Sequence, residues 1–244
     1  MNLLAASRVL GRIDARNVTR DPLLAWLLPL SLLLAAMFRY GVPPLATWLQ
    51  ENYQVDLVPH YPAIMSFGLL IAPTIVGTVI GFLLLDQRDD RTLEALRITP
   101  LTTRGYLGYR VLLPVAISVP ITLAVMLIMG LSLPGWDALL VGSVIAAPMA
   151  ALFALAFACI AENKVQGFAL SKASGLVNLP AVVAWFIQSD WQLLFGITPT
   201  YWIVKCYWQA MAGEPWLGFA LVGLVYQALI GWLLLRWFTR IISR

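Results

Sequence analysis

The amino-acid sequence predicts an all-α integral membrane protein in which one domain, residues 1–244, crosses the bilayer six times. Hydrophobic residues make up 61% of the 244 positions and charged residues only 11%, whereas soluble domains carry about 25% charge. Apolar stretches of membrane-spanning length recur along the chain, and most basic residues fall on one side of them. This composition cannot form a water-covered globule. It therefore excludes a soluble enzyme, a disordered chain and a nucleic-acid-binding module.

Residues 1–21 are predicted to form an amphipathic cytoplasmic helix before the first span. Arginine recurs at every fourth position and so occupies one face of a helix, as Arg8, Arg12, Arg16 and Arg20. Apolar side chains lie away from that stripe, namely Val9, Leu10, Ile13 and Val18. Such a helix can lie along the cytoplasmic leaflet with its arginines near anionic headgroups. A basic tail that only sets the topology is the alternative.

Six stretches are long and apolar enough to span the membrane. A span needs about 20 apolar residues, because the hydrocarbon core is about 30 Å thick and a helix rises 1.5 Å per residue. The stretches are Pro22–Phe38, Ala63–Leu85, Val111–Leu133, Ala138–Ala161, Ala173–Ile187 and Pro215–Leu235. A further candidate, Leu193–Met211, is interrupted by Gly196 and Pro199. We interpret it as part of an outer re-entrant segment, residues 188–215.

The distribution of basic residues supports six spans with both termini in the cytoplasm. With this topology all but two of the 16 lysines and arginines lie on the inner side, the exceptions being Arg39 and Lys205. A seventh span would place the three arginines near the C-terminus on the wrong side of the membrane. The sequence therefore predicts a multi-pass protein of the plasma membrane.

The predicted spans contain no Asp, Glu, Lys, Arg or His, which limits the chemistry that this chain can perform. Secondary transporters and membrane-embedded enzymes generally place charged groups within the membrane. The only histidine, His60, lies in an outer loop, and no glycine-rich loop of the Walker A type is present. We expect no catalytic residue, no metal site and no cofactor on this chain. Any ATP-driven work must then use an ATPase on another chain.

The inner loop of residues 86–110 is predicted to contain a short helix, Arg91–Ile98. Acidic residues stand at its positive N-terminal end and Arg97 near its negative C-terminal end, and Pro100 stops it. Leu93 and Leu96 share one face of this helix. A compact helix with an apolar centre and a charged rim is suited to docking in the groove of a partner protein.

The same loop resembles the signature of ABC-2-type transporter permeases. The matching residues are Thr92-Leu93-Glu94-Ala95-Leu96, Thr99-Pro100-Leu101 and Gly105-Tyr106-Leu107-Gly108-Tyr109-Arg110. The family usually has glycine before the threonine, where this chain has Arg91. Within the family, the chain is most similar to small permeases labelled fluoroquinolone or multidrug exporters. That likeness extends to Asp21-Pro22-Leu23-Leu24-Ala25-Trp26, Phe82-Leu83-Leu84-Leu85-Asp86 and the run that begins at Arg97.

The resemblance implies a transport subunit that contacts an ATPase through a cytoplasmic coupling helix. The residues it assigns to that contact are Arg91, Thr92, Leu93, Glu94, Leu96, Arg97 and Pro100. Two copies of a separate ATPase subunit would hold ATP and Mg²⁺, and a second permease subunit, identical or related, would complete the complex. Paired re-entrant helices before the last span would close the outer end of the pathway. The gate residues expected there are Pro199, Tyr201, Trp202, Tyr207 and Trp208.

Two functions from different classes are consistent with these patterns. The first is the permease of an ATP-driven exporter whose cargo is a lipophilic or amphipathic small molecule, such as a fluoroquinolone. The second is a membrane scaffold that transports nothing and docks a cytoplasmic partner through residues 86–110. An ATPase encoded beside this chain favours the permease, and an isolated gene favours the scaffold.

Overall fold

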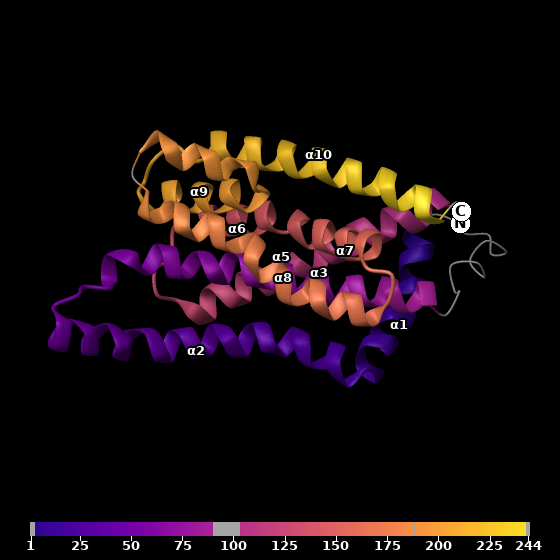
Figure 1. The fold of residues 1–244 in the computed structure, drawn as a ribbon, viewed down its shortest axis with the longest axis horizontal. Helices are drawn as coiled ribbons and strands as arrows, with labels where there is room; N and C mark the ends of the chain where they lie inside the picture. The colour runs from indigo at the N-terminus through magenta and orange to yellow at the C-terminus, as the bar shows by residue number, and fades with distance from the viewer. Residues whose placement is uncertain (1–2, 90–102, 188, 243–244) are drawn as a thin grey trace.

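The computed structural model describes residues 3–89, 103–187 and 189–242, and in these ranges the regular structure is helical throughout, without a strand. Six helical spans form a bundle with a common long axis (Figure 1). They are α2 (Pro22–Tyr53), α3 (Tyr61–Asp89), α5 (Thr103–Met129), the pair α6 (Trp136–Ala146) and α7 (Pro148–Ile160), α8 (Lys164–Val183) and α10 (Leu217–Ile242). The prediction of six spans is confirmed.

Helix α1 (Leu3–Arg20) lies crosswise at the end of the bundle where the chain begins and ends, which we call the terminus end (Figure 1). Asp21 separates α1 from α2 and caps α2, because its Oδ1 accepts hydrogen bonds from the backbone N–H groups of Leu23 and Leu24 at 3.0 and 3.3 Å. Proline at the first position of α2 needs no hydrogen-bond donor. The predicted start of the first span at Pro22 is therefore confirmed.

Helix α1 packs on the protein with part of its predicted apolar face. Leu10 is buried, and Val18 packs against the same hydrophobic cluster as Leu24 and Phe82. Ile13, by contrast, is 47% exposed. The helix is therefore attached to the bundle through Leu10 and Val18. Only its outward face is left for the contact with a lipid leaflet that the sequence predicts.

The opposite end of the bundle, which we call the far end, carries four short helices. They are η1 (Val58–His60), η2 (Ala184–Phe186), η3 (Asp190–Ile197) and α9 (Pro199–Met211). Helix α9 lies beside α10 in Figure 1, and it contacts α6 and α8 as well. Its 13 residues are too few to cross a bilayer. The interrupted stretch that could have been a seventh span is thus a short helix preceded by a 3₁₀ turn.

Several helix ends differ from the predicted bounds for identifiable reasons. Helix α2 continues beyond Phe38 to Tyr53, and the Arg39 within it donates a hydrogen bond to the carbonyl of Ile128 at 3.3 Å. Helix α5 begins at Thr103 rather than Val111, so that Arg110 lies inside a span. The predicted spans are apolar stretches that stop before a charged residue. A charged residue with a partner on a neighbouring helix does not end a helix, as Arg39 and Arg110 show.

The fourth span is interrupted at Ala147, between α6 and α7. Pro148, the first residue of α7, has no backbone N–H to continue the hydrogen-bond pattern of α6. Nearby, Gln227 of α10 donates from its side-chain amide to the carbonyl of Ile145 at 3.0 Å. A buried amide from a neighbouring span therefore satisfies one of the carbonyls at the interruption.

Helix α3 lies at the centre of the bundle, and its contact with α7 depends on glycine. A Cβ atom added at Gly77 would lie 2.5 Å from the Ala150 carbonyl oxygen and 2.6 Å from the Phe153 Cβ atom. One turn later, a Cβ atom at Gly81 would lie 2.7 Å from the Phe157 Cβ atom. Small residues of this kind let the backbones of membrane helices approach closely, where packing stabilises the pair.

We expect the Gly77→Ala substitution to destabilise the protein by about 1–3 kcal/mol, because the new methyl group meets the backbone of α7. Thermal and denaturant unfolding of the purified chain in detergent measure this change. The matched control is Gly142→Ala in α6, where no atom lies within 4 Å of an added Cβ. Alanine favours a helix over glycine, so the control should be neutral or stabilising. Equal destabilisation by both substitutions would contradict the close contact.

Candidate functional site

A buried ion pair connects α1 to α5 at the terminus end. Arg110 donates from Nη1 to Oδ2 of Asp14 at 2.7 Å and from Nη2 to Oδ1 at 3.3 Å. The two side chains are 0% and 4% exposed. A buried ion pair is stable only when further hydrogen bonds satisfy both partners, because removal of each charge from water costs several kcal/mol.

Three more side chains supply those hydrogen bonds. Gln87 of α3 accepts from Nη2 of Arg110 at 2.7 Å and from the Tyr106 hydroxyl at 3.1 Å. Tyr109 donates its hydroxyl proton to Oδ2 of Asp14 at 2.6 Å. The Arg110 guanidinium also lies 5.2 Å from the ring centroids of both tyrosines. We call these five residues the ionic cluster; it joins α1, α3 and α5.

The ionic cluster lies directly beside the segment that the sequence assigns to coupling. Helix α3 ends at Asp89, two residues after Gln87, and α5 begins at Thr103, shortly before Tyr106. The ionic cluster therefore binds the two helix ends that flank residues 90–102 to each other and to α1.

A second polar bridge lies at the same end of the bundle. Lys164 at the start of α8 places its Nζ 3.1 Å from Oδ2 of Asp21 and 2.9 Å from Oδ1 of Asp86. Burial alone would raise the pKa of Asp21, but the hydrogen bonds from Lys164 and from two backbone N–H groups outweigh it and hold that pKa below its ordinary value. Asp21 therefore stays ionised, and the bridge joins the starts of α2 and α8 to the end of α3.

The predicted coupling residues lie outside the described part of the chain. They are Arg91, Thr92, Leu93, Glu94, Leu96, Arg97 and Pro100, and their contact with an ATPase stays a prediction. The ionic cluster was not predicted, although two signals pointed to it. Asp14 does not lie on the arginine stripe of α1 but on the face that carries Leu10 and Val18, each four residues away. Arg110 is the last residue of the Gly105–Arg110 motif. Neither signal says that the two residues meet.

The predicted outer-gate residues lie on α9 at the far end. Tyr201, Tyr207 and Trp208 are buried, Trp202 is half-buried, and Pro199 starts the helix. Their polar atoms are bonded to other elements: Trp208 donates from Nε1 to Oγ of Ser66 at 2.8 Å, and Tyr207 donates to the carbonyl of Ser132 at 2.7 Å. Helix α9 is thereby anchored to α3 and to the segment between α5 and α6. Whether the residues act as a gate stays a prediction.

A polar groove of about 270 Å³ lies between the start of α2 and the central parts of α3 and α8. Most of its wall is apolar, but hydroxyl and amide groups gather on the faces of α3 and α8. Asn178 is 5% exposed and donates from Nδ2 to Oγ1 of Thr74 at 3.1 Å. Among the described residues, none donates a hydrogen bond to its Oδ1. Residues that line the groove include Leu27, Ile75, Thr78, Phe82, Phe168 and Lys172.

The polar groove has the chemistry of a site for an amphipathic ligand. Ligand sites combine a mainly apolar wall with a few placed polar groups. An unsatisfied buried acceptor costs about 1–3 kcal/mol, and a ligand that donates a hydrogen bond to Oδ1 of Asn178 would recover part of that cost. Phe82 and Phe168, whose ring centroids are 5.0 Å apart, add an aromatic surface to the same wall.

We expect a strong energetic coupling between Asp14 and Arg110. Either single substitution, Asp14→Ala or Arg110→Ala, leaves a buried charge without its partner and should cost about 3–5 kcal/mol of stability. The double variant should cost much less than the sum of the two. The free energies of unfolding of the wild type, the two single variants and the double variant form a double-mutant cycle that measures this coupling. The control is the exposed Arg12→Ala, which should change stability by less than about 0.5 kcal/mol. Additive costs would contradict the ion pair.

Comparison with known proteins assigns the chain to a family. The family described as "Fluoroquinolones export permease protein Rv2686c-like" matches residues 14–235. The chain is also similar to the proteins named fluoroquinolones export permease protein MT2760 and fluoroquinolones export permease protein Rv2686c, from two strains of Mycobacterium tuberculosis. Each is 35% identical over 242 residues, which is 96% of both chains. No solved structure gives a significant match. The chain belongs to the Rv2686c-like family of export permeases.

Proposed function

We propose that this protein is the membrane-spanning subunit of an ATP-driven exporter and moves a lipophilic or amphipathic small molecule out of the cell. The observation that carries the proposal is the ionic cluster, which joins three helices directly beside residues 90–102. Membership in a family of export permeases supports the direction of transport. In the proposed orientation the terminus end faces the cytoplasm, as the distribution of basic residues favours.

The energy for transport comes, in this proposal, from a separate ATPase. The chain has no Walker A loop that could hold nucleotide phosphates. Two copies of the ATPase subunit would bind ATP and Mg²⁺ and dock against residues 91–98 of each permease, for which the sequence predicts a helix. A second permease subunit, identical or related, would complete the pathway. The resemblance to ABC-2-type permeases supports both partners.

Movement would pass from the ATPase to the spans through the ionic cluster. A displacement of residues 90–102 acts on the end of α3 and the start of α5, and Arg110 passes it to α1 through Asp14. Lys164 passes it to α8 through Asp86. Helices α3 and α8 form two walls of the polar groove. The same displacement would therefore change the shape of that groove.

The polar groove is the part of the described chain best suited to hold the cargo. Its wall is mainly apolar, and Oδ1 of Asn178 is a buried acceptor to which none of the described residues donates a hydrogen bond. A planar aromatic molecule with one donor group would satisfy both features. The relatives from Mycobacterium tuberculosis are named for fluoroquinolone export, so fluoroquinolones are the first cargo to test.

We expect Leu93→Asp to abolish binding of the ATPase, because a carboxylate would enter the apolar centre of the docking face. Co-purification of the tagged chain with the ATPase encoded beside it measures the contact. Val165→Asp is the control: this side chain is 78% exposed near the terminus end of α8, and the variant should retain the ATPase. Normal co-purification of Leu93→Asp would contradict the proposal that the ATPase docks on this loop.

Asn178→Leu should weaken export of a fluoroquinolone by about tenfold, as expected when one buried hydrogen bond to the cargo is lost. The change should appear as a higher KM in vesicles with ATP supplied, while basal ATP hydrolysis stays normal. Asn17→Leu on the exposed side of α1 is the matched control and should export normally. Unchanged export by Asn178→Leu would exclude the polar groove as the cargo site.

A further inference from the structure

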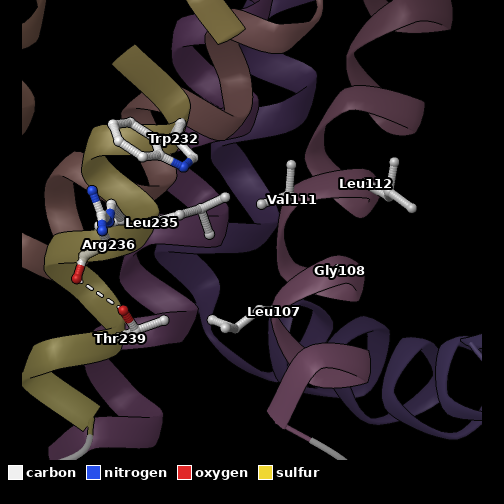
Figure 2. Close-up of a pocket in the computed structure, with 8 residues that line it drawn as sticks. All are labelled: Leu107, Gly108, Val111, Leu112, Trp232, Leu235, Arg236 and Thr239. Carbon is white, nitrogen blue, oxygen red and sulfur yellow. Dashed lines mark hydrogen bonds between the residues drawn. The ribbon is translucent and has the colours of Figure 1, made fainter. Parts of the chain in front are cut away.

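A second groove lies on the outside of the bundle near the terminus end, between the start of α5 and the end of α10 (Figure 2). Its volume is about 370 Å³. Helix α5 supplies an apolar wall, and α10 supplies an aromatic ring, an arginine and a threonine. The residues are Leu107, Gly108, Val111, Leu112, Trp232, Leu235, Arg236 and Thr239. We call it the α5–α10 groove.

Arg236 gives the α5–α10 groove a positive charge. Its guanidinium lies over the Trp232 ring, 4.4 Å from the centroid, which restricts the side chain to the rim of the groove. Among the residues that the structure describes, no carboxylate forms an ion pair with Arg236. Figure 2 shows Trp232, Leu235 and Arg236 on α10 opposite Leu107 and Val111 on α5. An apolar floor thus meets a cation that has no ion-pair partner among the described residues.

The groove lies at the depth where a lipid headgroup is found. Trp232 and Arg236 belong to the last three turns of α10, which ends at Ile242 at the terminus end. Tryptophan and arginine at the end of a span mark the boundary between hydrocarbon and water. With this boundary the apolar wall would lie in the hydrocarbon, and the cation of Arg236 would lie beside the phosphates of the same leaflet.

We propose that the α5–α10 groove binds one anionic phospholipid. An acyl chain lies along Leu107, Val111 and Leu235, and the phosphate pairs with Arg236. Basic pockets between membrane helices attract anionic headgroups by charge, and a zwitterionic lipid gains less because its own cation is repelled. The apolar wall favours a lipid over a free anion, which would make no use of it.

Such a lipid would contact the helix that carries most of the ionic cluster. Leu107 and Val111 line the α5–α10 groove, whereas Tyr106 and Arg110, each the preceding residue, point into the ionic cluster. The occupied groove would support the start of α5 on a face next to the one that contacts α1. This inference does not depend on the proposed ATPase partner or on the cargo.

The test is native mass spectrometry of the full chain, purified with equal amounts of phosphatidylglycerol and phosphatidylcholine. The wild type should retain phosphatidylglycerol preferentially. Arg236→Gln should lower that preference by about fivefold, as expected for one arginine beside an anionic headgroup. Arg12→Gln, which removes an exposed arginine of α1 at the same end, is the matched control and should keep the preference.

A second variant tests the apolar wall separately from the charge. Val111→Trp fills the groove but leaves Arg236 in place, and it should reduce retention of both lipids. Thermal unfolding of each variant confirms that it is folded. The proposal is overturned if Arg236→Gln keeps the wild-type preference. It is also overturned if Arg12→Gln loses as much, because the selectivity would then reflect only the total charge of that end.

Discussion

The pairing of Asp14 with Arg110 is the constraint on which the terminus end of the bundle depends. Two charges shielded from water are tolerated only with a short contact and further hydrogen bonds, and here the 2.7 Å contact is supplemented by Gln87 and Tyr109. These contacts hold α1, α3 and α5 together, because each of the three helices supplies at least one of the bonded side chains. The ion pair thus turns an N-terminal helix that could lie loosely on a leaflet into a part of the bundle.

The number and order of the spans could be predicted from the sequence, because the apolar length of a span is a local property. Helix ends were less predictable, since a charge such as Arg39 continues a helix when a neighbouring carbonyl accepts its hydrogen bond. For the same reason the predicted start of the third span, Val111, is later than the observed start of α5 at Thr103. The prediction places Arg110 in the inner loop of residues 86–110. Its partner is 96 residues away in the sequence, and no local pattern reveals such a pair.

The candidate sites, too, could be predicted from the sequence only where they depend on local spacing and not on contacts between distant residues. The amphipathic character of α1 follows from the four-residue spacing of its arginines, but which apolar residues contact protein depends on packing, as the burial of Leu10 and the exposure of Ile13 illustrate. The polar groove depends on a contact between Asn178 and Thr74, which are 104 residues apart. Each residue alone is an ordinary polar side chain in a span. Only their juxtaposition leaves an acceptor free beside an apolar wall.

The position of α1 relative to α5 is the most direct measure of the central claim. Spin labels on Arg16→Cys and Ala116→Cys, two exposed positions, report the distance between the helices in lipid nanodiscs by pulsed electron paramagnetic resonance. The two native cysteines, Cys159 and Cys206, are buried and should not take up label. The account predicts a single narrow distance distribution. A broad distribution, or a second population at longer distance, would show that α1 is free of the bundle and would contradict it.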